Sequence, residues 1–448
     1  METKYGIFTI SLDFELFWGV RDKRTIEDYE KNLEGAKKAI EILLEVFEEY
    51  EVHATWATVG FLFAQDSEEL GKAIPLRIPS YNDINLNPYQ YITKNYSLEP
   101  SYHFAPKLIK KIHNCKNQEI GTHTFSHYYC LEEGQNKDEF NSDIEAAVTI
   151  AKKNNIPIKS LVFPRNQLNE EYLSILNKHG IDSYRGNEQA WLYKTSSSSN
   201  NKFIKRVFRL LDSYINLTGS NTFSLGSIKS DKPYEIQSSC FLRPTSKKLA
   251  LIEGLKKRRI TNSLIKAAKN CEIFHLWWHP HNFGINTDEN IEFLTEILSC
   301  YRDMKSKHGM KSLNMGEISN LSFGHGYLLN DYGNNYNNPI KRNLGFSFNL
   351  RNSNNSVMYQ FFISSLEEAI NAGGLIGHHF SFLVSNSFPL RVGFGHVIDL
   401  NQLIDYNAVT TKRQVNGFEI DFDLPVITQN LFFIGEITGI RFPERRYY

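Results

Sequence analysis

The strongest constraint on the fold is an alternation of short apolar segments with long amphipathic segments over roughly the first 315 residues. Residues 6–12 form an apolar run that predicts a buried strand, and residues 26–50 follow with the spacing of an amphipathic helix rich in Glu and Lys. Residues 53–63 are apolar and β-branched and predict the next strand. Strands that alternate with helices form parallel sheets, because each helix returns the chain to the start of the next strand.

The alternation continues along the chain. A strand is expected just before Gly121, a helix over residues 138–153, a short strand over residues 158–163 and another strand over residues 273–278. The predicted fold class is therefore α/β, with parallel strands and crossover helices that are compatible with a barrel. Residues 65–106, rich in Asn, Tyr, Pro and Ser, interrupt the pattern, and we interpret them as an inserted lobe beside the functional site.

The character of the chain changes after about Leu313, where Gly, Asn, Ser and Phe become frequent and charges become rare. Period-two alternation of apolar residues predicts half-buried strands in this part. These strands are expected at residues 344–350, 379–384, 390–398, 418–424 and 431–442. The prediction is an α/β domain over residues 1–316 and a β-rich C-terminal region over residues 317–448, to which the sequence assigns no function.

The overall composition excludes several classes of partner. The 448 residues include 50 Lys and Arg and 50 Asp and Glu, so no net charge attracts a polyanion, and we expect no nucleic-acid partner. No segment reaches the roughly 18 apolar residues that a membrane-spanning helix needs. The five cysteines lack Cys-x-x-Cys spacing, and the N-terminus lacks the pattern of a secretory signal, so we expect a cytoplasmic protein with reduced thiols.

The first candidate site lies at the end of the opening strand, where Asp13 and Glu15 stand two residues apart. Alternate residues of a strand point to the same side, so both carboxylates face one spot. Two neighbouring carboxylates repel each other unless a cation lies between them or one of them serves as a base. The pair therefore indicates a metal. The alternative is that one acid caps the next segment or pairs with Arg21 or Lys23.

The second candidate is the segment Gly121–His127, in which His123 and His127 stand four residues apart. The two imidazoles share a face if the segment turns helical after the strand. Two imidazoles and one carboxylate make a three-ligand set that leaves positions open for water and substrate, as catalytic metal sites do. Two histidines at this spacing also occur by chance on exposed helices.

Two further clusters follow strands. Arg165, in the sequence Phe-Pro-Arg-Asn-Gln, could orient a carboxylate with its planar set of donors, although an arginine on an exposed turn is an equal alternative. The apolar segment 274–284 contains His275, His279 and His281 at alternate positions. We expect His275, deep in the strand, to bond to the backbone, and either His279 or His281 to be a proton donor.

In this order, the four clusters resemble the motifs of the polysaccharide deacetylase family, whose catalytic region is called the NodB homology domain. The resemblance covers about residues 5–316 and implies a deformed (β/α) barrel. It implies that Asp13 is the general base, His279 the general acid and Arg165 the arginine that steadies the base. It also implies that a divalent metal, with Zn²⁺ as the expected ion, is bound by Glu15, His123 and His127.

The wording Ser-Leu-Asp-Phe-Glu-Leu, Phe-Pro-Arg-Asn-Gln and Trp-Trp-His-Pro-His-Asn-Phe-Gly is similar to a subgroup that occurs with genes for surface-polysaccharide or O-antigen synthesis. The chain departs from the family pattern in that its two acids are two residues apart rather than adjacent and the second is Glu. The resemblance implies hydrolysis of an N-acetyl group from a sugar or polysaccharide precursor. Two alternatives remain: a metal-dependent deformylase or amidase of a non-sugar amide, and a catalytically silent carbohydrate-binding protein.

Overall fold

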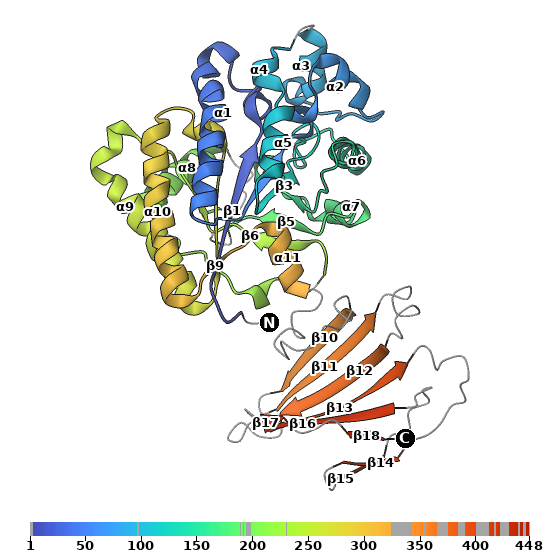
Figure 1. Ribbon diagram of the computed structural model, residues 1–448. Helices are drawn as coiled ribbons and strands as arrows, with labels where there is room; N and C mark the ends of the chain where they lie inside the picture. Colours follow the sequence, from blue (N-terminus) through green and yellow to red (C-terminus); the bar gives the residue numbers. More distant parts are fainter. Residues whose placement is uncertain are drawn as a thin grey trace. The chain divides into compact units, whose positions relative to one another are not determined.

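The computed structural model describes residues 3–95, 98–188, 190, 192–193, 199–229 and 231–323, together with the strands of the C-terminal region. The chain divides into two compact units, Met1–Ser322 and Phe323–Tyr448 (Figure 1). The boundary expected from the sequence, after residue 316, falls inside helix α11 (Met315–Phe323), which continues to the end of the first unit.

The first unit is built on one sheet of nine strands, in which every strand pair is parallel. The order of the strands is β6-β5-β4-β3-β2-β1-β8-β7, with β9 paired to β1. The strands are β1 (Ile7–Phe14), β2 (Ala54–Thr58), β3 (Gln118–Thr122), β4 (Ser160–Leu161), β5 (Ser183–Gly186), β6 (Tyr234–Gln237), β7 (Cys240–Phe241), β8 (Ile273–Trp278) and β9 (Lys311–Ser312). The predicted parallel α/β architecture is confirmed.

The two ends of this sheet are joined by only two residues, Ser238 and Ser239. The Ser238 amide donates to the Gly186 carbonyl on β5 over 2.9 Å, and the Ser239 amide donates to the His275 carbonyl on β8 over 2.9 Å. Because neighbouring residues bond to strands near opposite ends of the sheet order, the sheet must curl back on itself. This is the deformed (β/α) barrel that the sequence resemblance implied.

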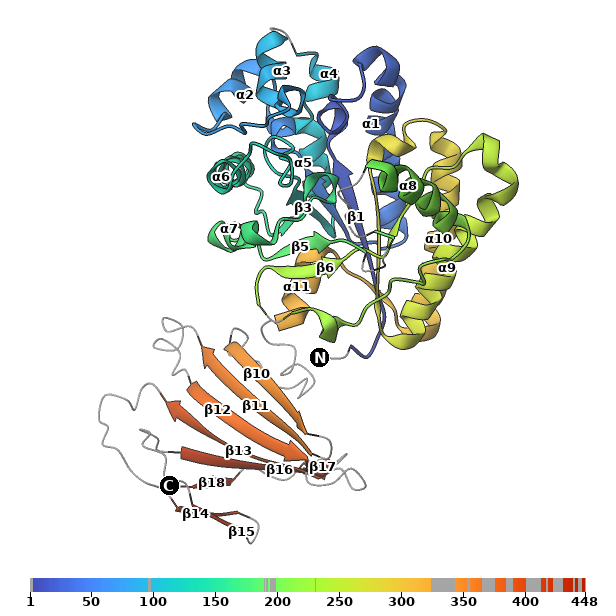
Figure 2. The same cartoon turned by 180° about the vertical axis from the view of Figure 1, so that it is seen from behind.

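Helices surround the curled sheet, and those of the inserted segment form a lobe at one end of it (Figures 1 and 2). The helices are α1 (Ile26–Glu49), α2 (Ser67–Ala73), α3 (Pro88–Lys94), α4 (Pro100–His103), α5 (Pro106–Asn114), α6 (Lys137–Lys153), α7 (Leu173–Lys178), α8 (Ser199–Tyr214), α9 (Glu253–Asn270), α10 (Thr287–His308) and α11. Thr25 caps the start of α1, because its side chain accepts from the Asp28 amide, and the buried residues of α1 recur every three or four positions.

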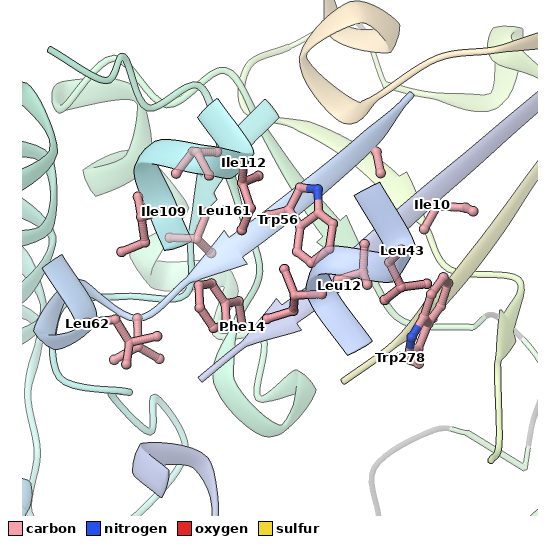
Figure 3. Close-up of a cluster of buried hydrophobic side chains, with 14 of the residues drawn as sticks. Ile10, Leu12, Phe14, Leu43, Trp56, Leu62, Ile109, Ile112, Leu161 and Trp278 are labelled. Atoms are coloured by element: carbon pink, nitrogen blue, oxygen red, sulfur yellow. The ribbon is translucent and has the colours of Figure 1, made fainter. Parts of the chain in front are cut away.

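The core lies between α1 and the central strands, where Leu12, Leu43, Trp56 and Trp278 pack together (Figure 3). All eight residues of β1 are buried, as in a parallel strand that is covered on both faces. Polar residues in such a strand need partners, so the buried Ser11 and Asp13 mark the point where the core gives way to a site.

The inserted segment 65–106 forms a helical lobe that contains α2, α3 and α4. It is fixed to the segment that follows β1: the Trp18 indole N–H donates to the His103 carbonyl over 2.8 Å, and Arg21 Nη1 donates to the Asn85 carbonyl over 2.8 Å. The lobe therefore packs against the segment that directly follows Asp13 and Glu15.

The second unit contains an antiparallel sheet in the order β10-β11-β12-β13-β16-β17, with β18 also paired to β16, and a separate β14-β15 pair. These strands are β10 (Asn343–Asn352), β11 (Asn355–Ser364), β12 (Leu375–Leu383), β13 (Leu390–Asp399), β14 (Lys412–Val415), β15 (Phe418–Asp421), β16 (Asn430–Ile437), β17 (Ile440–Arg441) and β18 (Arg445–Tyr447). The predicted β-rich tail is confirmed. Residues 384, 422–424, 438–439 and 442 of the expected strands lie outside the described residues. Within the described part of the chain, no helix is both long and apolar enough to span a bilayer.

Candidate active site

The candidate residues gather at the carboxyl ends of the parallel strands, the end at which barrels of this type carry their sites. Asp13 lies in the last part of β1 and Glu15 directly follows that strand. His123 follows β3 and His279 follows β8. Residues that are up to 266 positions apart in the sequence are thus brought to one place by the parallel order of the sheet.

Asp13 is held by an arginine that sequence reasoning missed. Arg185 on β5 donates from Nη1 to Asp13 Oδ1 over 2.7 Å and from Nη2 to Asp13 Oδ2 over 2.8 Å, and both side chains are buried. Burial by itself would raise the pKa of Asp13, but attraction to Arg185, His123 and His279 and the hydrogen bonds from Arg185 together hold that pKa below its usual range. Asp13 is therefore an ionised, oriented carboxylate at neutral pH.

Arg165, expected to steady Asp13, does not contact it. Its guanidinium instead pairs with the Asp22 carboxylate and lies 4.2 Å from the centre of the Tyr129 ring. The physical reason is the backbone: Arg165 has a φ of 56° and Asn166 a φ of 54°, so the short turn η4 (Pro164–Asn166) directs the arginine away from Asp13. The assignment of the base-holding arginine to position 165 is therefore wrong for this structure.

The same turn helps to hold Asp13 in place, because Asn166 contacts Arg185. The Asn166 side-chain oxygen accepts from Arg185 Nη2 over 3.0 Å, which helps to fix the guanidinium that holds Asp13. Arg185 also donates to the Ser11 hydroxyl over 3.0 Å and lies over the Trp277 ring at 4.1 Å. A signal was available in the sequence, because a basic residue inside the short strand segment Ser-Tyr-Arg-Gly needs a buried partner.

The three expected metal ligands come together. Glu15 Oε2 lies 3.0 Å from His127 Nε2 and 3.3 Å from His123 Nε2, and all three side chains are buried. One possible ligand atom from each residue lies within 4.8 Å of the others. Such a set, with two imidazoles and one carboxylate, has the composition of a catalytic site for a divalent metal.

The hydrogen bonds around this set test whether it fits a metal. His123 Nδ1 donates to the Val162 carbonyl over 2.8 Å, which leaves a lone pair on Nε2, and that atom has no hydrogen-bond partner although it is buried. Burial lowers the pKa of His127 to about 4, so this imidazole is neutral at pH 7. The unpartnered His123 Nε2, the His127 imidazole and the Glu15 carboxylate converge on one place, so the residues fit a divalent metal.

The sequence analysis expected a helical segment that brings His123 and His127 to one face. The loop that carries these histidines is not helical. Thr124 and His127 instead adopt positive φ values of 64° and 60°. Asp143 on α6 holds this loop: it accepts from the Phe125 amide over 2.7 Å and from the Ser126 hydroxyl over 2.5 Å. Burial raises the pKa of Asp143 to about 7. Sequence reasoning missed this residue, for which the only signal is an acid near the apolar face of α6.

The three histidines of segment 274–284 lie in different environments. His275 is fully buried, donates from Nδ1 to the Gln237 carbonyl over 3.0 Å and accepts at Nε2 from the Ser11 hydroxyl over 2.8 Å, as expected of a core histidine. His281 is buried, and burial lowers its pKa to about 4. His279 is 24% exposed, and its Nε2 lies 3.6 Å from Asp13 Oδ2 and 3.7 Å from Glu15 Oε1. His279 is therefore the histidine that a substrate can reach.

The chain is similar to known proteins over part of its length. The family model for polysaccharide deacetylase matches residues 28–184. No curated protein sequence matches the chain. Several solved structures resemble the chain with low TM-scores, among them the following three. A Mycobacterium smegmatis protein named as a polysaccharide deacetylase has a TM-score of 0.42 and 11% identity over 71% of this chain and 91% of its own.

The second structure is a wild-type pseudoenzyme of carbohydrate esterase family 4 from Bacillus anthracis, with a TM-score of 0.33 and 12% identity over 71% of this chain and 66% of its own. The third is a family 4 carbohydrate esterase from Streptomyces lividans, with a TM-score of 0.30 and 10% identity over 68% of this chain and 91% of its own. The fold assignment rests on the sheet topology. The similarity to the polysaccharide deacetylase family thus extends over residues 28–184, which include His123, His127 and Arg165.

Proposed function

We propose that this chain is a metal-dependent hydrolase that removes an acetyl group from the nitrogen of a sugar or polysaccharide precursor. The observation that carries the proposal is the convergence of Glu15, His123 and His127 beside the Asp13–Arg185 pair. A carboxylate kept ionised for proton transfer thus lies next to a set of ligands that the chain itself leaves without a cation. A site that only bound sugars would need neither feature.

Glu15, His123 and His127 are the residues that would hold the metal, and Zn²⁺ is the ion that a set of two imidazoles and one carboxylate favours. A divalent ion bound there supplies Lewis-acid polarisation of the amide carbonyl and lowers the pKa of a water molecule. The Nδ1–H bond from His123 to the Val162 carbonyl fixes the ring so that Nε2 is the ligand atom.

Asp13 acts as the general base in this proposal. Its carboxylate accepts the proton of the attacking water, and a base performs this step only while it is ionised. Arg185 favours the ionised form and fixes both oxygens, so the carboxylate does not rotate as the proton arrives. Asn166 in turn fixes Arg185.

His279 acts as the general acid. It is partly exposed, and its Nε2 lies within 4 Å of both Asp13 and Glu15, which supports this role. His279 can then donate a proton to the sugar nitrogen as the carbon–nitrogen bond breaks, so that a free amine and acetate leave. His281 is buried, with its ring centre 5.0 Å from that of His279, and is the less suitable donor.

The identity of the sugar rests on the sequence resemblance alone. The resemblance points to a precursor of a surface polysaccharide, carried on a nucleotide or a lipid. A cytoplasmic location also stays a prediction from the sequence. Neither is needed for the chemistry proposed above.

The test is acetate release from N-acetylhexosamine conjugates by the purified full chain, before and after removal of metal by a chelator and after addition of Zn²⁺. We expect activity to disappear with the metal and to return with it. His123→Ala should abolish both metal binding and activity, whereas His113→Ala, which changes an exposed histidine, should change neither. Acetate release that persists without bound metal would overturn the mechanism.

Two other results would select an alternative function. Release of formate from an N-formyl sugar, with no release of acetate, would replace the acetyl group by a formyl group. Stoichiometric metal binding and sugar binding with no turnover of any acylated substrate would favour a silent carbohydrate-binding protein.

A further inference from the structure

The two histidines of the proposed metal site differ in the partner of their Nδ1 atoms. His123 Nδ1 donates to the Val162 carbonyl over 2.8 Å, whereas His127 Nδ1 lies 3.1 Å from the hydroxyl oxygen of Tyr129. Tyr129 is fully buried, so no solvent competes for this hydrogen bond. A backbone carbonyl only accepts a hydrogen bond, whereas a hydroxyl both donates and accepts. The Val162 carbonyl therefore fixes the proton of one ring, and the Tyr129 hydroxyl suits either form of the other.

The other nitrogen of His127, Nε2, lies 3.0 Å from Glu15 Oε2. An ionised carboxylate only accepts, so this contact favours the single ring proton on Nε2, and the Tyr129 hydroxyl then donates to Nδ1. His127 can offer the lone pair of Nε2 to a metal only when its proton lies on Nδ1, and the Tyr129 oxygen then accepts from it. One hydroxyl therefore satisfies Nδ1 in both forms of the ring.

Tyr129 is itself held at its backbone and at its ring. Its amide donates to the Tyr81 hydroxyl over 2.8 Å, and both tyrosines belong to a small buried cluster with Leu86. The Arg165 guanidinium lies 4.2 Å from the centre of the Tyr129 ring, and a cation over an aromatic ring is attracted to its face. The hydroxyl oxygen lies on the axis of the ring, so a fixed ring also fixes the hydrogen-bond partner of His127.

Tyr81 belongs to the inserted lobe, and its neighbours tie this part of the lobe to the chain that follows the histidines. The Ser80 amide donates to Glu139 Oε2 over 3.1 Å. The Asn82 amide donates to the Glu133 carbonyl over 2.9 Å. Because Tyr81 is fastened on both sides, the lobe can hold the Tyr129 backbone in place.

We propose that Tyr129 is the positioning residue of the metal site and that the inserted lobe holds it there through Tyr81. Partners of this kind orient an imidazole ligand and make its free nitrogen a better donor to the metal. The proposal rests on the proposed function, because it requires that His127 binds a metal. It adds a task for the inserted lobe and for Arg165, which contacts Tyr129 instead of Asp13.

Tyr128 shows what a purely structural tyrosine looks like in the same loop. It is as fully buried as Tyr129, but its hydroxyl donates to Gln135 Oε1 over 2.9 Å and lies 3.1 Å from the Asn136 carbonyl. Neither partner belongs to the proposed metal site. Tyr128 and Tyr129 are therefore a matched pair, in which only one hydroxyl contacts a ligand.

Zn²⁺ affinity of the purified full chain, measured by competition with a chromogenic chelator, tests the proposal. Tyr129→Phe removes only the hydroxyl and should weaken Zn²⁺ binding about tenfold to a hundredfold. Tyr128→Phe removes an equally buried hydroxyl from the next residue and should bind Zn²⁺ as the unchanged protein does. Tyr81→Phe keeps the Tyr129 hydroxyl but removes the acceptor of its amide, so it should weaken binding by a smaller factor than Tyr129→Phe.

NMR spectra of the imidazole nitrogens, recorded with isotope-labelled histidine, give a second readout that a merely structural role would not move. When Zn²⁺ is added to the chelator-treated protein, we expect the His127 proton to move from Nε2 to Nδ1. His123 should keep its proton on Nδ1 throughout, because the Val162 carbonyl can only accept. Tyr129→Phe should change the signals of His127 and leave those of His123 in place.

The outcomes separate this proposal from the proposed function. Equal Zn²⁺ affinity in Tyr129→Phe and the unchanged protein, or an equal loss in Tyr128→Phe, would overturn the positioning role while the metal site stands. If Tyr129→Phe does not fold, Tyr81→Phe decides, and unchanged affinity there would overturn the proposal. Failure of the unchanged chain to bind Zn²⁺ would overturn the proposed function together with this inference.

Discussion

The two carboxylates at the end of β1 are two residues apart in the sequence, yet the structure treats them in opposite ways. Asp13 is matched by a permanent cation of the chain, with two hydrogen bonds from Arg185. Glu15 faces two imidazoles, and no lysine or arginine is paired with it among the described residues. Asp13 therefore has a permanent cationic partner within the chain, whereas Glu15 has only histidine partners among the described residues.

This difference assigns the two acids to different tasks. A carboxylate that already has a guanidinium partner gains less from a metal, whereas a carboxylate that faces neutral nitrogens gains much from one. The unusual Asp-x-Glu pairing left open which acid is the base and which is the ligand. The position of Arg185 favours Asp13 as the base, and the following predictions test that distinction.

The largest effect is expected for Arg185→Met. Loss of the guanidinium leaves Asp13 buried without a cation, which should cost about 3–5 kcal/mol of stability. Arg185 lowers the pKa of Asp13, so its contribution to stability is present above the unfolded pKa and is lost as the pH falls through the lower folded pKa. In the variant that pKa rises, so the acidic limb of the pH–activity profile should move to higher pH.

Denaturant unfolding at pH 7 and the pH–activity profile measure these two effects. Arg258→Met, which removes an exposed arginine, serves as the control and should leave both unchanged. An unshifted acidic limb in Arg185→Met would mean that Asp13 is not the group whose ionisation limits activity.

The next prediction compares the two acids directly in the metal-free protein. Asp13→Asn should destabilise by about 2–4 kcal/mol, because Arg185 is left buried without its counter-ion. Glu15→Gln should destabilise the metal-free protein less than Asp13→Asn does, because Glu15 is hydrogen-bonded to His127 but has no lysine or arginine partner among the described residues. Thermal unfolding after treatment with a chelator measures both. Equal destabilisation by the two substitutions would contradict the proposed difference between the two halves.

A smaller effect is expected for Asp143→Asn, which acts on the metal half through the loop. Asp143 accepts from the Phe125 amide and the Ser126 hydroxyl, and the amide of Asn would place a donor against one of these donors. Zn²⁺ affinity should fall about tenfold to a hundredfold. Competition with a chromogenic chelator measures it, and Asp138→Asn, at an exposed position of the same helix, is the control. Unchanged affinity would mean that the loop holds its shape without Asp143.

The parts of this site that sequence alone predicts are those fixed by strand ends. Asp13 and Glu15 share a face because a strand has a period of two, and parallel order brings His123 and His279 to the same end of the barrel. These relations depend only on periodicity and topology. The structure accordingly brings those residues together.

The parts that sequence did not predict depend on local backbone and tertiary contact. Whether Arg165 or Asn166 faces the site is decided by positive φ values in a turn, and apolar periodicity contains no information about them. Arg185 reaches Asp13 across the interior of the barrel from β5, a strand that the pattern did not reveal. Asp143 contacts the histidine loop from a helix that the sequence predicted well, but the contact itself depends on how that helix packs.

The smallest effect, and the one that tests the correction, is expected for Arg165→Met. Arg165 is partly exposed and pairs with Asp22, so its loss should cost only about 1 kcal/mol of stability. Because it does not contact Asp13, the acidic limb of the pH–activity profile should stay where it is in the unchanged protein. Measured beside Arg185→Met, the pair forms a matched test of which guanidinium holds the base. A shift of the acidic limb in Arg165→Met, with none in Arg185→Met, would exchange the two arginines and remove the difference between the two halves of the site.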